Sequence, residues 1–337
     1  MPLFKVSIPA NADMLFKKIM EIAAFEIFEI GEPLDKLLDL EPTGPFNRNF
    51  DSVGLESIYL INNLGTLNFF YLAWVIGALL TVLLGPFIYE SQKIRDTHTK
   101  MRKALFYNSI ISLFLETYSL LAVCCLINKS YLSFESFGKS FHSMACLFFI
   151  ALILVLPFIL GRHLLRFFKS LQEKSNKRIF GSSYEELDLR VGKLVLVQPF
   201  FFLVRRLMIA IAIVIVNQVL IWQIMLMASQ IVASVIIIGS VRPYRHPSKR
   251  KIEIFNEIIL MVVMYTIICF SDLVPNIEVR FTIGYVCMAT ISTHLGVNFI
   301  IIGKTTYNKI RMKILLRLAI RRYKKERQVK QLKSITN

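Results

Sequence analysis

Two adjacent arginines, Arg205 and Arg206, interrupt a long apolar run and raise the first chemical question. They lie within "FLVRRLMIAIAIVIVNQVLIWQIMLM", residues 202–227. A guanidinium inside hydrocarbon costs at least about 2.5–3.5 kcal/mol on insertion scales, so it requires an acceptor. Charged groups at such depth either hold helices together or mark ion pathways.

Glu116 in "SLFLETYSLL" is the acid at matching depth. Arg206 lies eleven residues before Asn217, about 16 Å along a helix, and Glu116 lies twelve residues before Asn128, about 18 Å. Because these depths agree, the sequence predicts an ion pair between Glu116 and one of the two arginines. Successive helical residues point about 100° apart, so only one guanidinium faces Glu116.

Glu257 in "IFNEIIL" is the alternative acid, near the cytoplasmic end of its own apolar run. An arginine that extends its long side chain toward that end can reach it. We interpret the Glu116 pair as a structural clamp between the second and fourth apolar runs. A gating or ion-pathway element is the alternative interpretation.

The composition places these charges in a membrane protein. The chain has 337 residues, is 55% hydrophobic and carries a net charge of +17. The positive charge falls in short blocks between apolar runs, which is typical of cytoplasmic membrane loops and argues against nucleic acid as a partner.

Seven apolar runs reach the length of about 20 residues that a spanning helix needs. The second run is the weakest because it contains Glu116, and the fourth and fifth are contiguous, with a turn expected at Asn217 and Gln218. The runs are residues 65–89, 108–128, 142–167, 194–216, 218–240, 254–271 and 281–302.

Loop charges predict the orientation of the bundle. The first, third and fifth loops are basic, and the tail after the last run has twelve Lys or Arg and one Glu. The rule that basic loops stay cytoplasmic therefore places the N-terminus outside and the C-terminus inside, in an all-α integral membrane protein of the plasma membrane. We expect an acidic extracellular segment over 1–64, a seven-helix bundle over 65–303 and a basic cytoplasmic tail over 304–337.

The acidic N-terminal segment contains one predicted helix, residues 11–28. Its apolar positions recur at helical spacing, and Asn11 or Asp13 can cap it. We expect an amphipathic helix on the outer rim of the bundle, with a partner-binding helix as the alternative.

The third loop holds an acidic patch in "RIFGSSYEELDLR", residues 178–190. We expect Gly181 to form a turn and Ser182 or Ser183 to cap a short helix that begins there. The patch is predicted to dock against the basic fifth loop, "VRPYRHPSKRK". The docking residues are Tyr184, Glu185, Glu186, Arg242 and Arg245.

The tail "KIRMKILLRLAIRRYKKERQVKQLK" is predicted to form a basic amphipathic helix. Such a helix binds anionic lipids of the inner leaflet, at about 1 kcal/mol per basic residue near the surface. A calmodulin-type partner and a solvated tail are the alternatives. The predicted lipid-binding residues are Arg317, Arg321, Arg322, Lys324 and Lys325.

No pattern of enzyme residues occurs in the chain. It contains no G-x-S-x-G, no P-loop and no H-E-x-x-H, and its five histidines are scattered. The five cysteines lie in apolar stretches, which is typical of small buried hydrophobes. We therefore expect no enzyme activity, no metal and no cofactor.

Six short stretches in order carry a resemblance to a known family: "INNLGTLNFF", "ETYSLL", "FGSSYEELDLR", "RRLMIAIAI", "RPYRHP" and "EIFNEIILMVVMY". Together they resemble the C-terminal multipass membrane module of ciliate cysteine-rich surface proteins. That module is similar to the membrane region of fungal TRP-like proteins, also called flavin carriers. The resemblance covers residues 8–298 and implies a TRP-like bundle that serves anchoring, assembly or signalling at the cell surface.

Two other functions fit a chain with seven spans. An ion channel or transporter subunit is the first, with other membrane subunits or a second copy of the chain as partners. The last outer loop, residues 272–280, is too short for a TRP-type pore helix and filter. A seven-span receptor is the second, although the chain lacks the D-R-Y and N-P-x-x-Y motifs of G-protein-coupled receptors.

The orientation can be tested by protease mapping of sealed membranes. We expect cleavage beside Tyr323 only when protease reaches the cytoplasmic side. Cleavage there from the outside of intact cells would contradict the topology and the depth comparison drawn from it.

Overall fold

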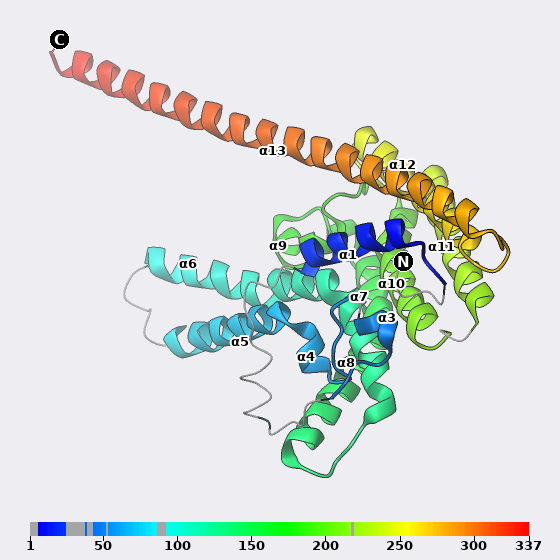
Figure 1. Cartoon of the computed structure of the whole chain (residues 1–337). Coiled ribbons are helices and arrows are strands. Elements are labelled where there is room, and N and C mark those ends of the chain that lie inside the picture. Colours follow the sequence, from blue (N-terminus) through cyan, green and yellow to red (C-terminus); the bar gives the residue numbers. More distant parts are fainter. Residues whose placement is uncertain are drawn as a thin grey trace.

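The computed structural model describes residues 6–24, 38, 43–51, 53–85, 92–216 and 219–336. The named regular elements of this part are all helices (Figure 1). They are α1 (Ala10–Ala24), α3 (Arg48–Asp51), α4 (Leu60–Leu64), α5 (Thr66–Leu84), α6 (Gln92–Lys103), the π-helix η2 (Ala104–Ser109), α7 (Ile110–Asn128), α8 (Phe137–Arg166), α9 (Lys174–Tyr184), α10 (Val197–Val214), α11 (Leu220–Val241), α12 (Pro247–Cys269) and α13 (Ile277–Thr336), with short 3-10 turns η3 (Lys129–Tyr131), η4 (Phe168–Ser170) and η5 (Lys193–Leu196).

Seven helices in the described part are long and apolar enough to cross a membrane: α5, α7, α8, α10, α11, α12 and α13. Each overlaps one predicted run, so the all-α, seven-span fold is confirmed. The turn expected at Asn217 and Gln218 lies outside the described residues. Beside it, the Gln223 side chain of α11 donates to the Ala212 carbonyl of α10 at 2.9 Å, as a tight antiparallel helix pair requires.

Helix α7 lies at the centre of the larger hydrophobic core, between α8 and α10. Tyr118, Leu121 and Cys124 are fully buried in it. The Tyr118 hydroxyl of this run donates to the Ile153 carbonyl of α8 at 2.8 Å, so this polar group is satisfied inside the bundle, whereas Glu116 is exposed. The run predicted to be the weakest is nevertheless the most buried span.

A second, smaller core joins α1 to α11, α12 and α13. Ala12 and Phe16 of α1 are buried in it, and Asn11 donates from its side chain to the Phe281 carbonyl at 2.9 Å. Gly284 permits this close approach, because a Cβ there would lie 2.3 Å from the Asn11 side chain. The N-terminal helix therefore packs against the bundle through one face, while Met14 on another face is 66% exposed.

The chain before α5 covers the ends of α7 and α8. Asn128 at the end of α7 donates to the Ile58 carbonyl at 3.1 Å, and the Ile61 amide donates to the His142 ring of α8 at 3.4 Å. Phe50 and Leu60 of this segment are buried against the same helices. Residues 43–51 and 53–64 thus form a cap on the end predicted to face outside.

The first basic loop, expected over residues 90–107, is helical from Gln92 onward. Lys, Arg, Gln and Met favour helix, so α6, η2 and α7 follow one another without a break. A π-helical turn disturbs the usual ladder of backbone hydrogen bonds. In η2, the Leu105 carbonyl accepts from the Trp74 indole of α5 at 2.9 Å, which pairs α5 with this continuous helix.

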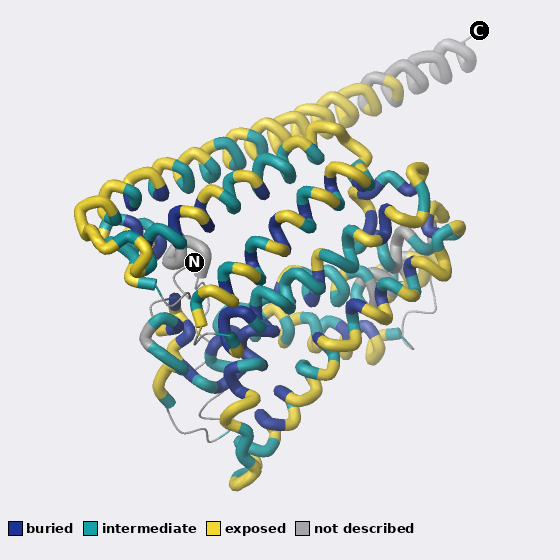
Figure 2. The backbone as a smooth tube through the Cα atoms, turned by 90° about the vertical axis from the view of Figure 1, so that its right-hand side faces the viewer, coloured by how far each residue is buried: buried dark blue, intermediate teal, exposed yellow. Residues whose placement is uncertain are grey.

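Helix α13 has 60 residues and runs beyond the bundle in both views (Figures 1 and 2). Its first turns pack on α12 and α1, whereas residues 302–320 are exposed. The basic tail is therefore a direct continuation of the last span. Arg317 is exposed on it; the backbone at Arg321, Arg322, Lys324 and Lys325 is helical, and their side chains lie outside the described part.

The central position of α7 can be tested with Leu121→Ala. Within a bilayer the cost comes mainly from the cavity and the lost packing contacts, and we expect about 2 kcal/mol or more of lost stability. The readout is the thermal midpoint of the purified protein in detergent. The matched control is Leu83→Ala on the exposed face of α5, where Leu83 is 64% exposed and little change is expected. Equal effects of the two changes would contradict the packing described for α7.

Candidate functional site

Arg205 of α10 forms a bidentate ion pair with Glu257 of α12. Its Nη1 contacts Glu257 Oε1, and its Nη2 donates to Oε2 at 3.0 Å. The two side chains are only 18% and 8% exposed. The planar guanidinium fork matches the two carboxylate oxygens, which makes this geometry the strongest that an arginine offers.

Ser234 of α11 completes the ion pair from a third helix. Its hydroxyl donates to Glu257 Oε1 at 2.9 Å and accepts from Arg205 Nη1 at 3.4 Å. Arg205, Glu257 and Ser234, which we call the polar triad, therefore link α10, α11 and α12. Breaking one partner of such a buried pair typically costs about 3–5 kcal/mol, because the other charge is left uncompensated.

Arg206 finds its acceptors on α7, but they are not the predicted carboxylate. Its Nη1 donates to the backbone carbonyl of Leu115 and, at 3.3 Å, to that of Glu116. Its guanidinium also lies over the Phe202 ring, 4.1 Å from the centroid. These contacts satisfy the buried cation without a counter-charge in direct contact.

The predicted ion pair between Glu116 and an arginine is therefore not the one that forms. The Glu116 side chain is exposed, and it accepts a hydrogen bond from Ser112 on its own helix at 3.1 Å. The agreement in depth correctly predicted that Arg206 lies beside the turn of α7 that contains Glu116. Depth does not determine the direction in which the Glu116 side chain points. The alternative acid, Glu257, is the partner of Arg205.

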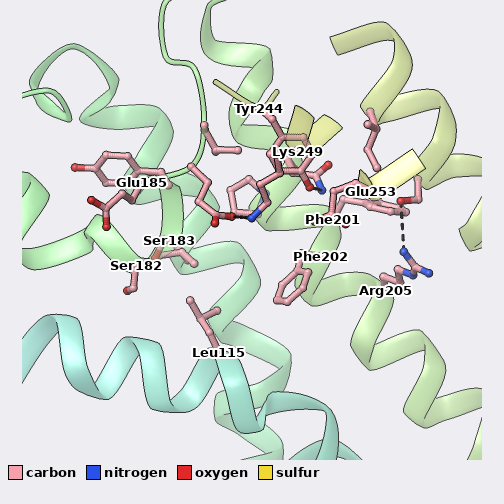
Figure 3. A pocket seen from close by; sticks show the side chains of 18 of the residues that line it. Leu115, Ser182, Ser183, Glu185, Phe201, Phe202, Arg205, Tyr244, Lys249 and Glu253 are labelled. Atoms are coloured by element: carbon pink, nitrogen blue, oxygen red, sulfur yellow. Dashed lines mark hydrogen bonds and ion pairs between the residues drawn. The ribbon is translucent and has the colours of Figure 1, made fainter. Parts of the chain in front are cut away.

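A cavity of about 350 Å³ lies beside the polar triad (Figure 3). Its walls come from α7, α8, the end of α9 and the residues after it, and the facing parts of α10, α11 and α12. Glu186, Tyr244, Lys249 and Glu253 line the part nearest the basic loops, and Arg205 and Glu257 line the deeper part. Charged groups of both signs thus surround a space between the spans.

The third and fifth loops meet over this cavity. The Asp188 amide donates to the Pro243 carbonyl at 2.8 Å, and the Arg245 amide donates to the Glu186 carbonyl at 3.1 Å. The Lys249 ammonium contacts the Glu186 carboxylate. An isolated antiparallel bridge between Leu187 and Tyr244 lies between these contacts, so two loops expected on the same face are joined there.

The helix at this face ends near the residues that were predicted to start it. Helix α9 continues through Gly181 and ends at Tyr184, whereas a helix start at Ser182 or Ser183 was expected. Glycine costs about 1 kcal/mol in a helix, and contacts between α9 and η2 offset that cost. One such contact is the Ser182 amide, which donates to the Asn108 side chain at 3.0 Å.

The other predicted docking residues are used in different ways. Tyr184 is buried and donates to the Leu171 carbonyl at 2.7 Å, and burial raises the pKa of its hydroxyl. Arg242 ends α11 in the left-handed region, with φ of 51°. Arg245 docks through its backbone amide, and Glu185 lies in the cavity wall.

Asp188 fixes the local geometry of the third loop where it contacts the fifth loop. Arg190 donates to both of its carboxylate oxygens, at 2.8 and 2.9 Å. These bonds, with a smaller contribution from the charge of Arg245, hold the pKa of Asp188 below its usual value. The pair is exposed, so its role is to fix local geometry rather than to stabilise the whole fold.

Four residues of the site were not singled out from the sequence: Ser234, Tyr244, Lys249 and Glu253. Ser234 is a small polar residue in an apolar span, which is a weak signal for a helix contact. Tyr244 is partly buried, which raises the pKa of its hydroxyl, and this hydroxyl accepts from the Gln198 side chain at 3.0 Å. Only the folded arrangement brings these residues beside Arg205.

No family model, curated protein or solved structure matches this chain. The fold itself defines the class: an integral membrane protein with seven apolar helices in the described part and a polar triad between three of them.

The polar triad can be tested with Glu257→Gln. We expect a loss of about 3–5 kcal/mol in stability, because Arg205 remains buried without its counter-charge. Thermal unfolding in detergent, at a concentration where the chain is monomeric, is the measurement. Glu116→Gln is the matched control, and its effect is expected to stay below about 1 kcal/mol because its side chain is exposed.

A double variant, Arg205→Leu with Glu257→Leu, is expected to be more stable than Glu257→Gln because it leaves no unpaired buried charge. A larger loss for Glu116→Gln than for Glu257→Gln would overturn the assignment of the pair.

Proposed function

We propose that this protein is the membrane-embedded module of a TRP-like cell-surface protein and that it serves assembly, anchoring or signalling. The observation that carries the proposal is the exposed carboxylate of Glu116. It lies about 9 Å along α7 from Ile110, within a span, and its side chain is exposed there. Ionisable groups inside a membrane almost always face protein or water. A neighbouring subunit that contacts Glu116 would therefore shield its carboxylate from lipid.

The arrangement of the rest of the bundle supports an assembling module. The apolar outer face of α5 is largely exposed, and the polar triad and the cap formed by residues 43–51 and 53–64 hold the other spans together. Such a scaffold keeps a fixed shape while its outer surface contacts lipid or another subunit. The TRP-like relationship rests on the six ordered stretches of the sequence.

The tail is proposed to bind anionic lipids at the inner leaflet. In α13, Ile310, Ile314, Leu315 and Leu318 are exposed large apolar side chains, and Arg317 lies among them. Apolar and basic residues on one exposed helix are the combination that interfacial helices use.

An ion channel or transporter subunit is the second candidate, and the cavity beside the polar triad favours it. Charged residues between spans often lie on solute pathways. The connection from α12 to α13 is short, since α12 ends at Cys269 and α13 begins at Ile277. That length argues against a TRP-type pore within one chain. Planar-bilayer recording of the purified protein separates the candidates, because reproducible selective currents would favour transport.

Assembly can be tested with Glu116→Leu. We expect the native protein to form an oligomer in mild detergent and Glu116→Leu to shift it toward monomer, because the shared polar contact is lost. Light scattering with size-exclusion chromatography is the measurement. Glu135→Gln, in the exposed connection before α8, is the matched control and is expected to leave the oligomer intact. A wild-type protein that stays monomeric in both detergent and nanodiscs would contradict the proposal.

A further inference from the structure

Two acceptor groups that line the cavity beside the polar triad, the Glu253 carboxylate and the Gln198 amide oxygen, form no hydrogen bond with the described residues. The two cationic side chains of the cavity are both engaged, Arg205 with Glu257 and Lys249 with Glu186. Glu253 also lines the cavity, where the charges of Lys249 and Arg205 act on it, but neither forms an ion pair or hydrogen bond with it in the described part. One carboxylate therefore faces the space without a counter-charge in contact.

A second acceptor lies in the same wall. Gln198 uses its amide nitrogen to donate to Tyr244, and its Oε1 is buried without a hydrogen-bond partner in the described part. A buried amide oxygen without a partner destabilises the folded state, and a donor from a ligand would remove that cost. The cavity lining has more acidic than basic side chains, since Glu185, Glu186, Glu253 and Glu257 face only Arg205 and Lys249. The cavity is therefore suited to a ligand that supplies N–H groups and positive charge.

The size and walls of the cavity indicate an organic cation rather than a bare metal ion. About 350 Å³ is within the usual range for small-molecule sites, about 300–1,000 Å³. Leu160, Ile238 and Phe201 supply apolar surface, and Phe201 is labelled in Figure 3 near Glu253 and Arg205. Apolar walls with a few fixed polar groups are typical of pockets that hold small organic ligands.

We propose that this cavity binds the ammonium group of an organic amine, with Glu253 as its counter-ion and Gln198 Oε1 as a hydrogen-bond acceptor. The apolar part of the ligand lies against Phe201, Leu160 and Ile238. The docked third and fifth loops form the wall nearest the basic face, so the ligand reaches the site beside the bridge between Leu187 and Tyr244. The proposal concerns a single chain and does not depend on assembly.

The test is isothermal titration calorimetry of the full chain in detergent with n-butylammonium and with 1,4-diaminobutane at constant ionic strength. We expect saturable binding of one ligand per chain. Loss of a hydrogen bond to a charged group changes Kd by about tenfold or more, so Glu253→Gln is expected to weaken binding by at least that factor. Glu278→Gln, at the exposed start of α13, is the matched control and is expected to bind like the wild type.

Further variants keep the proposal testable if Glu253→Gln folds poorly. Glu253→Asp retains the charge and is expected to bind within about threefold of the wild type, since roughly 0.65 kcal/mol corresponds to that change. Gln198→Met removes only the amide acceptor and is expected to weaken binding less than Glu253→Gln does.

Four results would overturn the proposal. The first is equal binding of the neutral isostere 1-butanol, the second is unchanged amine binding by Glu253→Gln, and the third is Mg²⁺ binding that Glu253→Gln abolishes in the absence of amine. An amine headgroup of a lipid is chemically equivalent to a free amine. Native mass spectrometry from nanodiscs of phosphatidylethanolamine or phosphatidylcholine shows whether a lipid headgroup occupies the site. Failure of both the lipid and the free amine to bind would also refute the site.

Discussion

The free-energy cost of placing a charge inside a membrane constrains how the helices of this protein pack. The ion pair between Arg205 and Glu257 is the main interaction that lowers this cost. Neither group can remain ionised in hydrocarbon without a partner, so α10 and α12 are held at one distance and one register. Ser234 extends the constraint to α11. One hydrophobic core is built around α7, α8 and α10, and the other around α11, α12 and α13, so the polar triad lies where the two cores meet.

Other polar side chains between the helices are stabilised by different kinds of contact. Arg206 uses backbone carbonyls and an aromatic ring, Tyr118 uses a carbonyl of the adjacent helix, and Lys249 lies far enough toward the loops to pair with Glu186. The bundle therefore does not need one acid for each base. Among the residues that the structure describes, Glu116 and Glu253 form no ion pair, although Arg206 lies near the first and Lys249 and Arg205 lie near the second. These two positions are where a second molecule is proposed to act.

The number and class of spans could be predicted from the sequence, because apolar length and charged loops are properties of the chain itself. The partner of each arginine could be predicted only as a choice between acids. Depth follows from residue counting, but the direction of Glu116 depends on how α7 rotates against α10, and no local pattern encodes that rotation. The start of α9 was placed incorrectly for a related reason: Gly181 favours a turn in isolation, and contacts with η2 outweigh that preference.

The absence of a break between the last span and its tail has a mechanical consequence. A helix of 60 residues is about 90 Å long and transmits rotation along its whole length. Its first turns hold α1 through Asn11 and Phe281, at the end opposite the charged extension. Asn298 of the same helix also donates to the Asn256 side chain of α12 at 3.0 Å, so only the part beyond it, about 57 Å long, is free of the bundle. A tilt of about 5° about that point would carry the far tip through about 5 Å. The chain thus contains a lever whose short arm is clamped within the bundle and whose long arm sweeps the space beyond it.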